Sequence, residues 1–170
     1  MLKQIETIGI KNLAKIARIK TIIIALLLIA FLVIEKSSVT YNAPNNQVNV
    51  FQFLWLMDSI YRLEFWFSLL SPISYISAVF IAADMFGKFS EGVEFDDTVN
   101  DSLEKIGLCV GFGAFAAIFL EPNLISWTSP EPRIIFNFTI ESLTIGVIGG
   151  TLIFTNFIAR KLKRELDEIV

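Results

Sequence analysis

The residues best suited to take part in chemistry are two carboxylic acids in apolar surroundings, Asp84 and Glu141. An acid within or at the edge of a bilayer is unfavourable and usually faces protein or a water-filled path. Glu141 belongs to a polar line on one helical face, which consists of Asn137, Glu141, Thr144, Thr151 and Thr155. A transporter could use two such acids as proton or cation sites reached from opposite sides of the membrane. We favour the simpler interpretation that the hydroxyls bond neighbouring helices and the acids lie among lipid headgroups.

A second group of acids occupies a charged run just before an apolar segment. The candidate partner-binding residues in this run are Glu94, Asp96, Asp97, Asp101 and Glu104. Asp97, Asp101 and Glu104 form an acidic stripe on one helical face, because they lie four and three residues apart. Such a surface suits a basic DNA-binding protein, whose approach it would speed. The alternative is an ordinary solvated face, since an exposed ion pair contributes only about 0 to 1 kcal/mol.

Composition and motifs argue against other chemistry. With no His and a single Cys, the chain cannot form the usual zinc sites, haem ligation or His-based catalytic triads. It has no Gly-rich phosphate loop, no G-x-S-x-G and no H-E-x-x-H sequence, and the charged run lacks the ligand spacing of a calcium loop. The 14 basic and 17 acidic residues nearly balance, at a net charge of -3. We therefore predict a protein that is not an enzyme, binds no cofactor or metal and does not bind nucleic acid directly.

These acids lie on or next to predicted membrane helices. Hydrophobic residues make up 54% of the chain, with 16 Phe and a mean hydropathy of +0.64, far more than a soluble domain needs for its core. Runs that can cross a bilayer lie at about 16–34, 65–87, 103–120 and 134–159. Pro72 is expected to kink the second of these spans, and Pro122 is expected to end the third span. The sequence predicts an all-α integral membrane bundle of four transmembrane helices, in a single domain over 1–170.

Residues 2–20 predict an amphipathic helix at the membrane surface. Its polar face carries a basic stripe of Lys11, Lys15 and Arg18, while its apolar face can lie in the headgroup region. Each cation near anionic lipid contributes roughly 1 kcal/mol of attraction, so membrane lipid is a predicted partner. The basic stripe has the same spacing as the acidic stripe, and the two could face each other.

The distribution of cations predicts the orientation in the membrane. Eleven of the 14 Lys and Arg residues lie before the first span, between the second and third, or after the fourth. Only Lys36, Arg62 and Arg133 lie on the other side. By the positive-inside rule, both termini and the loop at 88–105 are cytoplasmic. All three Trp residues then fall at the outer edge of the bilayer, which their rings prefer.

Two glycine pairs predict how the helices pack. Gly107 and Gly111 lie four residues apart in the third span, and Gly146 and Gly150 do so in the fourth. Small residues at this spacing let helix backbones approach closely. We predict that these pairs pack the third helix against the fourth. The alternative is contact between two chains in a homo-oligomer.

The charged run also resembles part of a known family. The matching residues are Gly92, Phe95, Leu103, Ile106 and Gly107, which are similar to the segment that enters the third helix of small four-helix bacterial membrane proteins of unknown function, the YoaS type. The acidic carboxyl end, 165–170, looks like the end of that family too. The resemblance implies a multi-pass protein of the bacterial cytoplasmic (inner) membrane. It also implies a partner, because genes of this family often neighbour one for a Cro-like helix-turn-helix regulator.

The leading hypothesis is therefore a non-enzymatic integral membrane protein that anchors or senses a cytoplasmic DNA-binding regulator through the charged run. One alternative is a small transporter or immunity-type membrane protein that uses Asp84 and Glu141. Another is an accessory subunit of a larger membrane complex, which the glycine pairs would suit.

Overall fold

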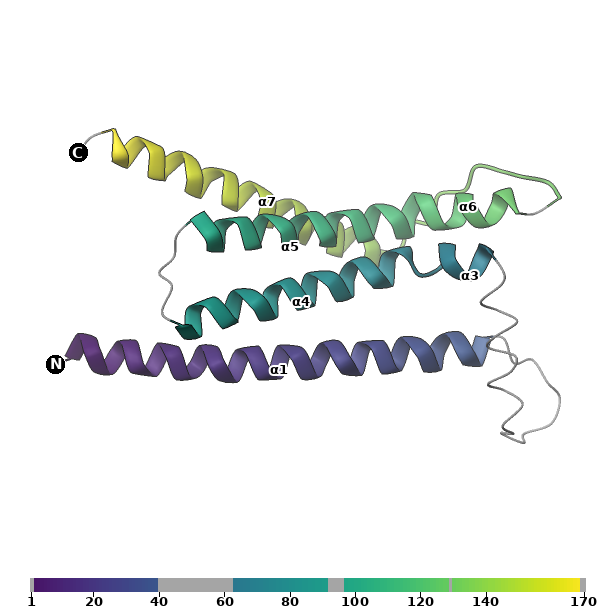
Figure 1. Cartoon of the computed structure of the whole chain (residues 1–170). Coiled ribbons are helices and arrows are strands. Elements are labelled where there is room, and N and C mark those ends of the chain that lie inside the picture. The colour runs from purple at the N-terminus through teal and green to yellow at the C-terminus, as the bar shows by residue number, and fades with distance from the viewer. Residues whose placement is uncertain (1, 40–62, 92–96, 129, 169–170) are drawn as a thin grey trace.

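The computed structural model describes residues 2–39, 63–91, 97–128 and 130–168 (Figure 1). Its helices are α1 (Leu2–Val39), α3 (Leu63–Phe67), α4 (Leu70–Glu91), α5 (Asp97–Phe115), the π-helical turn η1 (Ala116–Leu120), α6 (Glu121–Trp127) and α7 (Ile140–Asp167). No strand occurs within these residues, so the predicted all-α fold is confirmed. The predictions on Gly92, Glu94, Phe95 and Asp96 lie outside the described residues, and so does the side chain of Asp97.

Four stretches are long and apolar enough to cross a membrane: Lys11–Val33, Leu63–Glu91, Val99–Trp127 and Ile140–Glu165. The hydrocarbon core of a bilayer is about 30 Å thick, which takes about 20 helical residues. With 38 and 28 residues, α1 and α7 are about 57 and 42 Å long, so both exceed that thickness. By helix length and composition, the chain is a multi-pass membrane protein, as predicted.

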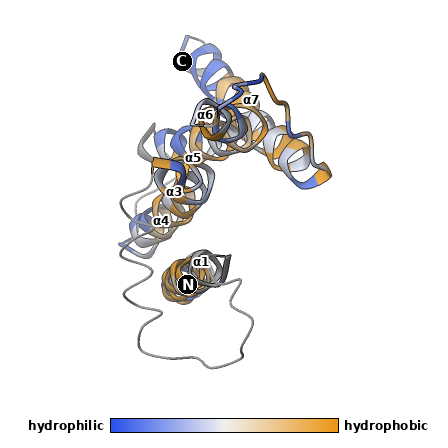
Figure 2. Ribbon diagram, turned by 90° about the vertical axis from the view of Figure 1, so that its right-hand side faces the viewer, coloured by the Kyte–Doolittle hydropathy of each residue, from blue (hydrophilic) through white to orange (hydrophobic). Residues whose placement is uncertain are grey.

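The four spans lie side by side in a single row, in the order α1, α4, α5 and α7 (Figures 1 and 2). Each helix packs on its neighbour in the row. α1 begins and α7 ends at the same end of the molecule, which we call the terminal end, and α6 lies at the opposite, far end. A single row buries few side chains, so most large apolar residues are exposed on the helix surfaces, where they suit lipid.

α1 is one continuous helix from Leu2 to Val39 (Figure 1). The predicted amphipathic helix at 2–20 is its first half and continues into the span without a break. Its position at the membrane surface stays a prediction. The second span is interrupted earlier than expected, between the end of α3 at Phe67 and the start of α4 at Leu70. Pro72 lies in the first turn of α4, where its missing N–H leaves no helical bond unmade, so it does not act as a kink within the helix.

The third span does not end at Pro122, so that predicted boundary is wrong. α5 passes through η1 into α6, which places Pro122 in the first turn of a helix, where proline is tolerated. Pro122 has no N–H to give to the carbonyl of Ile118, four residues before it. The backbone N–H of Asn137 donates to that carbonyl instead, at 2.9 Å. A residue from beyond the helix therefore replaces the bond that proline removes.

The fourth helix begins later than predicted, because residues 132–139 form a non-helical return segment. Three of its backbone N–H groups donate hydrogen bonds to the preceding helix, at positions progressively nearer the start of that helix. The N–H of Arg133 donates to Ser126 Oγ at 2.8 Å, and that of Ile135 to Asn123 Oδ1 at 3.0 Å. The N–H of Asn137 donates to the carbonyl of Ile118 at 2.9 Å. From Ser126 back to Ile118 is about 12 Å of helix, whereas four extended residues cover about 13 Å. The return segment is thus an extended stretch, without strand pairing, that runs antiparallel to α6 and η1.

Glycines bring α5 and α7 close together. A Cβ atom built on Gly149 would lie only 2.7 Å from the backbone N of Gly111, and one built on Gly107 would lie 3.0 Å from the carbonyl oxygen of Gly149. A Cβ on Gly146 would contact Ala114 at 3.3 Å. The predicted packing partner Gly150 is wrong, since a Cβ built on it would meet nothing within 4 Å. The fourth-helix pair at this contact is therefore Gly146 and Gly149.

Candidate functional site

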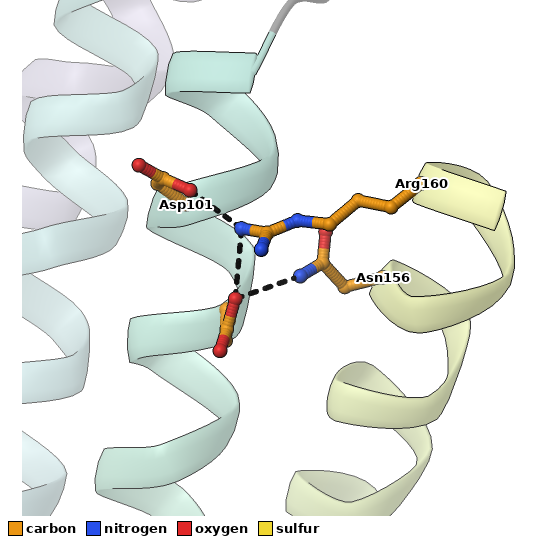
Figure 3. A network of polar contacts seen from close by, with 4 residues as sticks. Asp101, Asn156 and Arg160 are labelled. Atoms are coloured by element: carbon orange, nitrogen blue, oxygen red, sulfur yellow. Dashed lines mark hydrogen bonds and ion pairs between the residues drawn. The ribbon is translucent and has the colours of Figure 1, made fainter. Parts of the chain in front are cut away.

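A polar cluster lies between α5 and α7 at the terminal end (Figure 3). The guanidinium of Arg160 donates to Asp101 at 2.5 Å and to Glu104 at 2.8 Å. Asn156, one turn before Arg160, donates from Nδ2 to the carboxylate of Glu104 at 3.2 Å. We call these four residues, Asp101, Glu104, Asn156 and Arg160, the terminal network.

Helical spacing explains why these side chains meet. Asp101 and Glu104 lie on one face of α5, and Asn156 and Arg160 lie on the face of α7 that continues from Gly149. Asn156 is only 3% exposed, whereas the side chains of Arg160 and Asp101 are 36% and 58% exposed. The network therefore joins a buried amide to charges at the surface. Solvent screens those charges, so each ion pair contributes about 0 to 1 kcal/mol.

The terminal network changes the interpretation of the acidic stripe. Asp101 and Glu104 are paired with Arg160 of α7, so they are neither a purely solvated face nor partners of the basic stripe on α1. On α1, Arg18 lies against α4 instead, because a Cβ built on Gly87 would be 3.1 Å from its Cζ atom. Asp101 still has more than half of its side chain exposed.

Two buried amide oxygens near this network have no hydrogen-bond partner among the described residues. They are Oδ1 of Asn156 and Oδ1 of Asn100, which lies one turn before Glu104 on α5. A buried acceptor without a donor is unfavourable by about 1 to 3 kcal/mol. The polar interior of this contact is therefore suited to accept further hydrogen bonds, as from a buried water.

The two candidate intramembrane acids are not brought together. Asp84 forms an ion pair with Lys88 at 2.9 Å, one turn further along α4 toward the terminal end. Glu141 is exposed in the first turn of α7, at the opposite end, where a negative charge suits the helix dipole. Thr139 caps the same turn, because its Oγ1 accepts the N–H of Ser142 at 3.1 Å. Glu141 therefore has a local role at the start of a helix.

The hydroxyls of Thr144 and Thr151 in the polar line do not bond neighbouring helices. Thr144 and Thr151 are exposed, and their hydroxyls donate to carbonyls of α7 itself, those of Ile140 and Val147, at 2.7 and 2.8 Å. Asn137 lies in the return segment, outside α7. The expectation of interhelical bonds from Thr144 and Thr151 is wrong because α5 packs on a different face of α7, the one that carries the glycines.

A second polar cluster, at the far end, was not predicted. Oε1 of Glu121 accepts both the backbone N–H and the hydroxyl of Ser71, each at 2.7 Å, so it stabilises the first turn of α4. Nδ2 of Asn123 donates to the carbonyls of Phe119 and Ile135, at 2.6 and 2.7 Å. Its Oδ1 accepts the N–H of Ile135, and the residue is 6% exposed. Asn123 therefore bonds the return segment as a neighbouring strand would.

The signal for this cluster was the run Glu121-Pro122-Asn123 at the end of an apolar stretch. Two strongly polar residues beside a proline indicate, from the sequence alone, only the end of a helix. At membrane depth, polar side chains at that position have a further use, because they can satisfy backbone groups that a proline and a non-helical segment leave free.

Fold and sites together define the class: a multi-pass α-helical membrane protein whose polar side chains join the ends of its helices. Within the described residues, no group of three or more His, Cys, Asp or Glu residues is placed to hold a metal ion. No family model, curated protein or solved structure matches the chain. A proposal about function therefore depends on the geometry and on the sequence.

Proposed function

We propose that the protein is a non-enzymatic anchor or sensor that holds a cytoplasmic regulator at the bacterial cytoplasmic membrane. The terminal end is its cytoplasmic face, because most of the cations lie in the segments at that end. The regulator is a small DNA-binding protein of the helix-turn-helix type, as the family resemblance of the charged run implies. Bound to the membrane, such a regulator is kept from its operator.

The terminal network is the observation that carries this proposal. It joins the ends of α5 and α7 through Asp101 and Glu104, the acids of the charged run whose side chains the structure describes, and it leaves Asp101 more than half exposed. A surface whose charges are fixed in place loses little conformational freedom when a partner binds. Because the run is acidic, it favours a basic partner, mainly through faster encounter.

The test must leave the terminal network intact, since changing Asp101 or Glu104 would also leave Arg160 without its partner. The binding variant carries Glu94→Gln, Asp96→Asn and Asp97→Asn. The matched control removes three acids from the end of the chain, with Glu165→Gln, Asp167→Asn and Glu168→Gln. The measurement is the share of a tagged Cro-like helix-turn-helix regulator from the same cells that sediments with membranes.

We expect the regulator to leave the membrane fraction only with the binding variant. Equal retention by the wild type, the binding variant and the control would contradict the role of the charged run. A regulator that stays soluble in cells with the wild-type chain would contradict the anchor proposal itself.

A second candidate function, an accessory subunit of a larger membrane complex, is favoured by the polar line. Glu141, Thr144, Thr151 and Thr155 are all exposed on α7, away from its contact with α5. A polar face at membrane depth usually meets protein rather than lipid. Extraction in mild detergent followed by a mass measurement tests this function: a second kind of chain in the particle supports it, and a particle of this chain alone contradicts it.

A further inference from the structure

Within the part of the chain that the structure describes, the return segment is hydrogen-bonded along one edge and open along the other. Because N–H and C=O of a residue in an extended chain point to the same side, alternate residues serve opposite edges. Arg133, Ile135 and Asn137 bond α6 and η1. The backbone groups of Ile134, Phe136 and Phe138 point the other way, and no hydrogen bond to them occurs among the described residues.

This open edge lies at membrane depth. Glu104 marks the charged end of α5. The return segment is attached at Ile118 and Ser126, which lie 14 and 22 residues, or about 21 and 33 Å, further along. For a hydrocarbon core about 30 Å thick that begins at Glu104, Phe136 and Phe138 lie within its outer part and Ile134 lies at its boundary. Phe136 and Phe138 are 55% and 65% exposed, and Ile134 is 77% exposed. Lipid can solvate these side chains but cannot satisfy the backbone beside them.

Only a partner with a matching row of donors and acceptors can cover such an edge. We propose that this partner is a second copy of the chain, whose return segment pairs with the first in the antiparallel direction. Along the edge N–H and C=O alternate, so an identical edge that runs the opposite way places C=O opposite N–H at every position. A two-fold contact of this kind uses the same surface on both copies.

The proposed pairing has a definite register. Phe136 faces Phe136 of the second copy, and Ile134 faces Phe138, so all six open backbone residues are paired. The rings of Phe136 and Phe138 are already stacked, with centroids 5.9 Å apart, and Phe136 also lies 5.3 Å from Phe119. The two aromatic surfaces thus meet beside the paired backbones, and the polar edges of both strands are removed from lipid. This contact is independent of the proposed anchor function.

Cysteine cross-linking in membranes tests the pairing. Cys109 is the only cysteine, so Cys109→Ala provides a background in which each new thiol reacts alone. In a directly paired position of antiparallel strands, Cα atoms are about 5.5 Å apart, which a disulfide can bridge. We expect oxidation to cross-link Phe136→Cys chains at least about fivefold faster than Ile140→Cys or Phe157→Cys chains. These two controls are more exposed than Phe136, but the proposed pairing places them far from their counterparts across the two-fold axis.

A mixed experiment fixes the register. Chains with Ile134→Cys should cross-link to chains with Phe138→Cys faster than either cross-links to itself. Cross-linking of Phe136→Cys that only equals the Ile140→Cys control, or that falls away when the membranes are diluted with lipid, would overturn the proposal. A single chain per particle after reconstitution of the wild type into lipid nanodiscs would overturn it as well. Loss of regulator binding, with the cross-link intact, would count against the anchor function alone.

Discussion

The two ends of the α5 and α7 pair are joined by different kinds of bond. At the terminal end, side chains meet side chains, and the charges of Arg160 and Asp101 are reachable by water. At the far end, side chains meet backbone, and Asn123 replaces helical and strand bonds that the chain cannot otherwise make. When a side-chain pair at the terminal end is lost, water can bond the exposed charges instead. Water cannot do so for the bonds between side chains and backbone at the far end. We therefore expect the far end to maintain the fold and the terminal end to be open to a partner.

The largest expected effect is at Asn123. Asn123→Ala removes the buried side chain that bonds both the N–H and the carbonyl of Ile135, so the free energy of unfolding should fall by about 3 kcal/mol. Asn137→Ala is the matched control, because Asn137 uses its backbone N–H and its side chain is exposed. Denaturant titration of both variants in detergent measures the difference. Similar losses for the two would show that the return segment is not fixed by the Asn123 side chain.

The glycine contact between the two ends comes next. Gly149→Ala places a Cβ 2.7 Å from the backbone of Gly111, so the helices must move apart, at about 2 kcal/mol. Gly150→Ala meets open space and should be neutral or stabilising by up to about 1 kcal/mol, since alanine favours a helix. The same titration compares them. A reversed order would mean that α7 is rotated relative to α5 from the arrangement described above.

A smaller effect is expected for the start of α4. Glu121→Ala removes the acceptor for the N–H and hydroxyl of Ser71, a loss typical of a helix cap, about 1 to 2 kcal/mol. Glu131→Ala removes an exposed acid from the same end of the molecule and should change stability by less than about 0.5 kcal/mol. Thermal unfolding in detergent followed by circular dichroism measures both. Equal stability of the two variants would mean that Glu121 does not stabilise the start of α4.

The smallest expected effect on stability is at the terminal network. Arg160→Gln should lower stability by about 1 kcal/mol or less, because its ion pairs are half exposed. The effect should shrink further in high salt, which screens such pairs. Arg164→Gln, one turn further along α7, is the control. If Arg160→Gln lowered the free energy of unfolding as much as Asn123→Ala, the two ends would not differ in their contribution to stability.

The number and type of the spans could be predicted from the sequence, because a bilayer requires about 20 apolar residues in a helix whatever the neighbours are. The positions that depend on neighbours could not. Gly149 and Gly150 differ by one position, which is about 100° of rotation on α7, and spacing alone does not show which of them faces α5.

Only the two acids of the terminal network could be predicted from the sequence. Helical spacing placed Asp101 and Glu104 on one face, but the cation that meets them, Arg160, is set by the contact between α5 and α7. The far end was missed for a related reason. Pro122 usually ends a helix, and only the return of the chain as an extended segment lets Asn137 supply the missing donor to Ile118.

The most direct test of the central proposal is the affinity of the purified regulator for the chain embedded in nanodiscs, measured at low and high salt. We expect the wild-type chain to bind the regulator, and the affinity to fall as salt rises. The variant with Glu94→Gln, Asp96→Asn and Asp97→Asn should lose this binding. The control with three changed acids near the carboxyl end should retain it. No binding by the wild type, or equal binding by the variant and the control, would contradict the proposal that the terminal end holds the regulator.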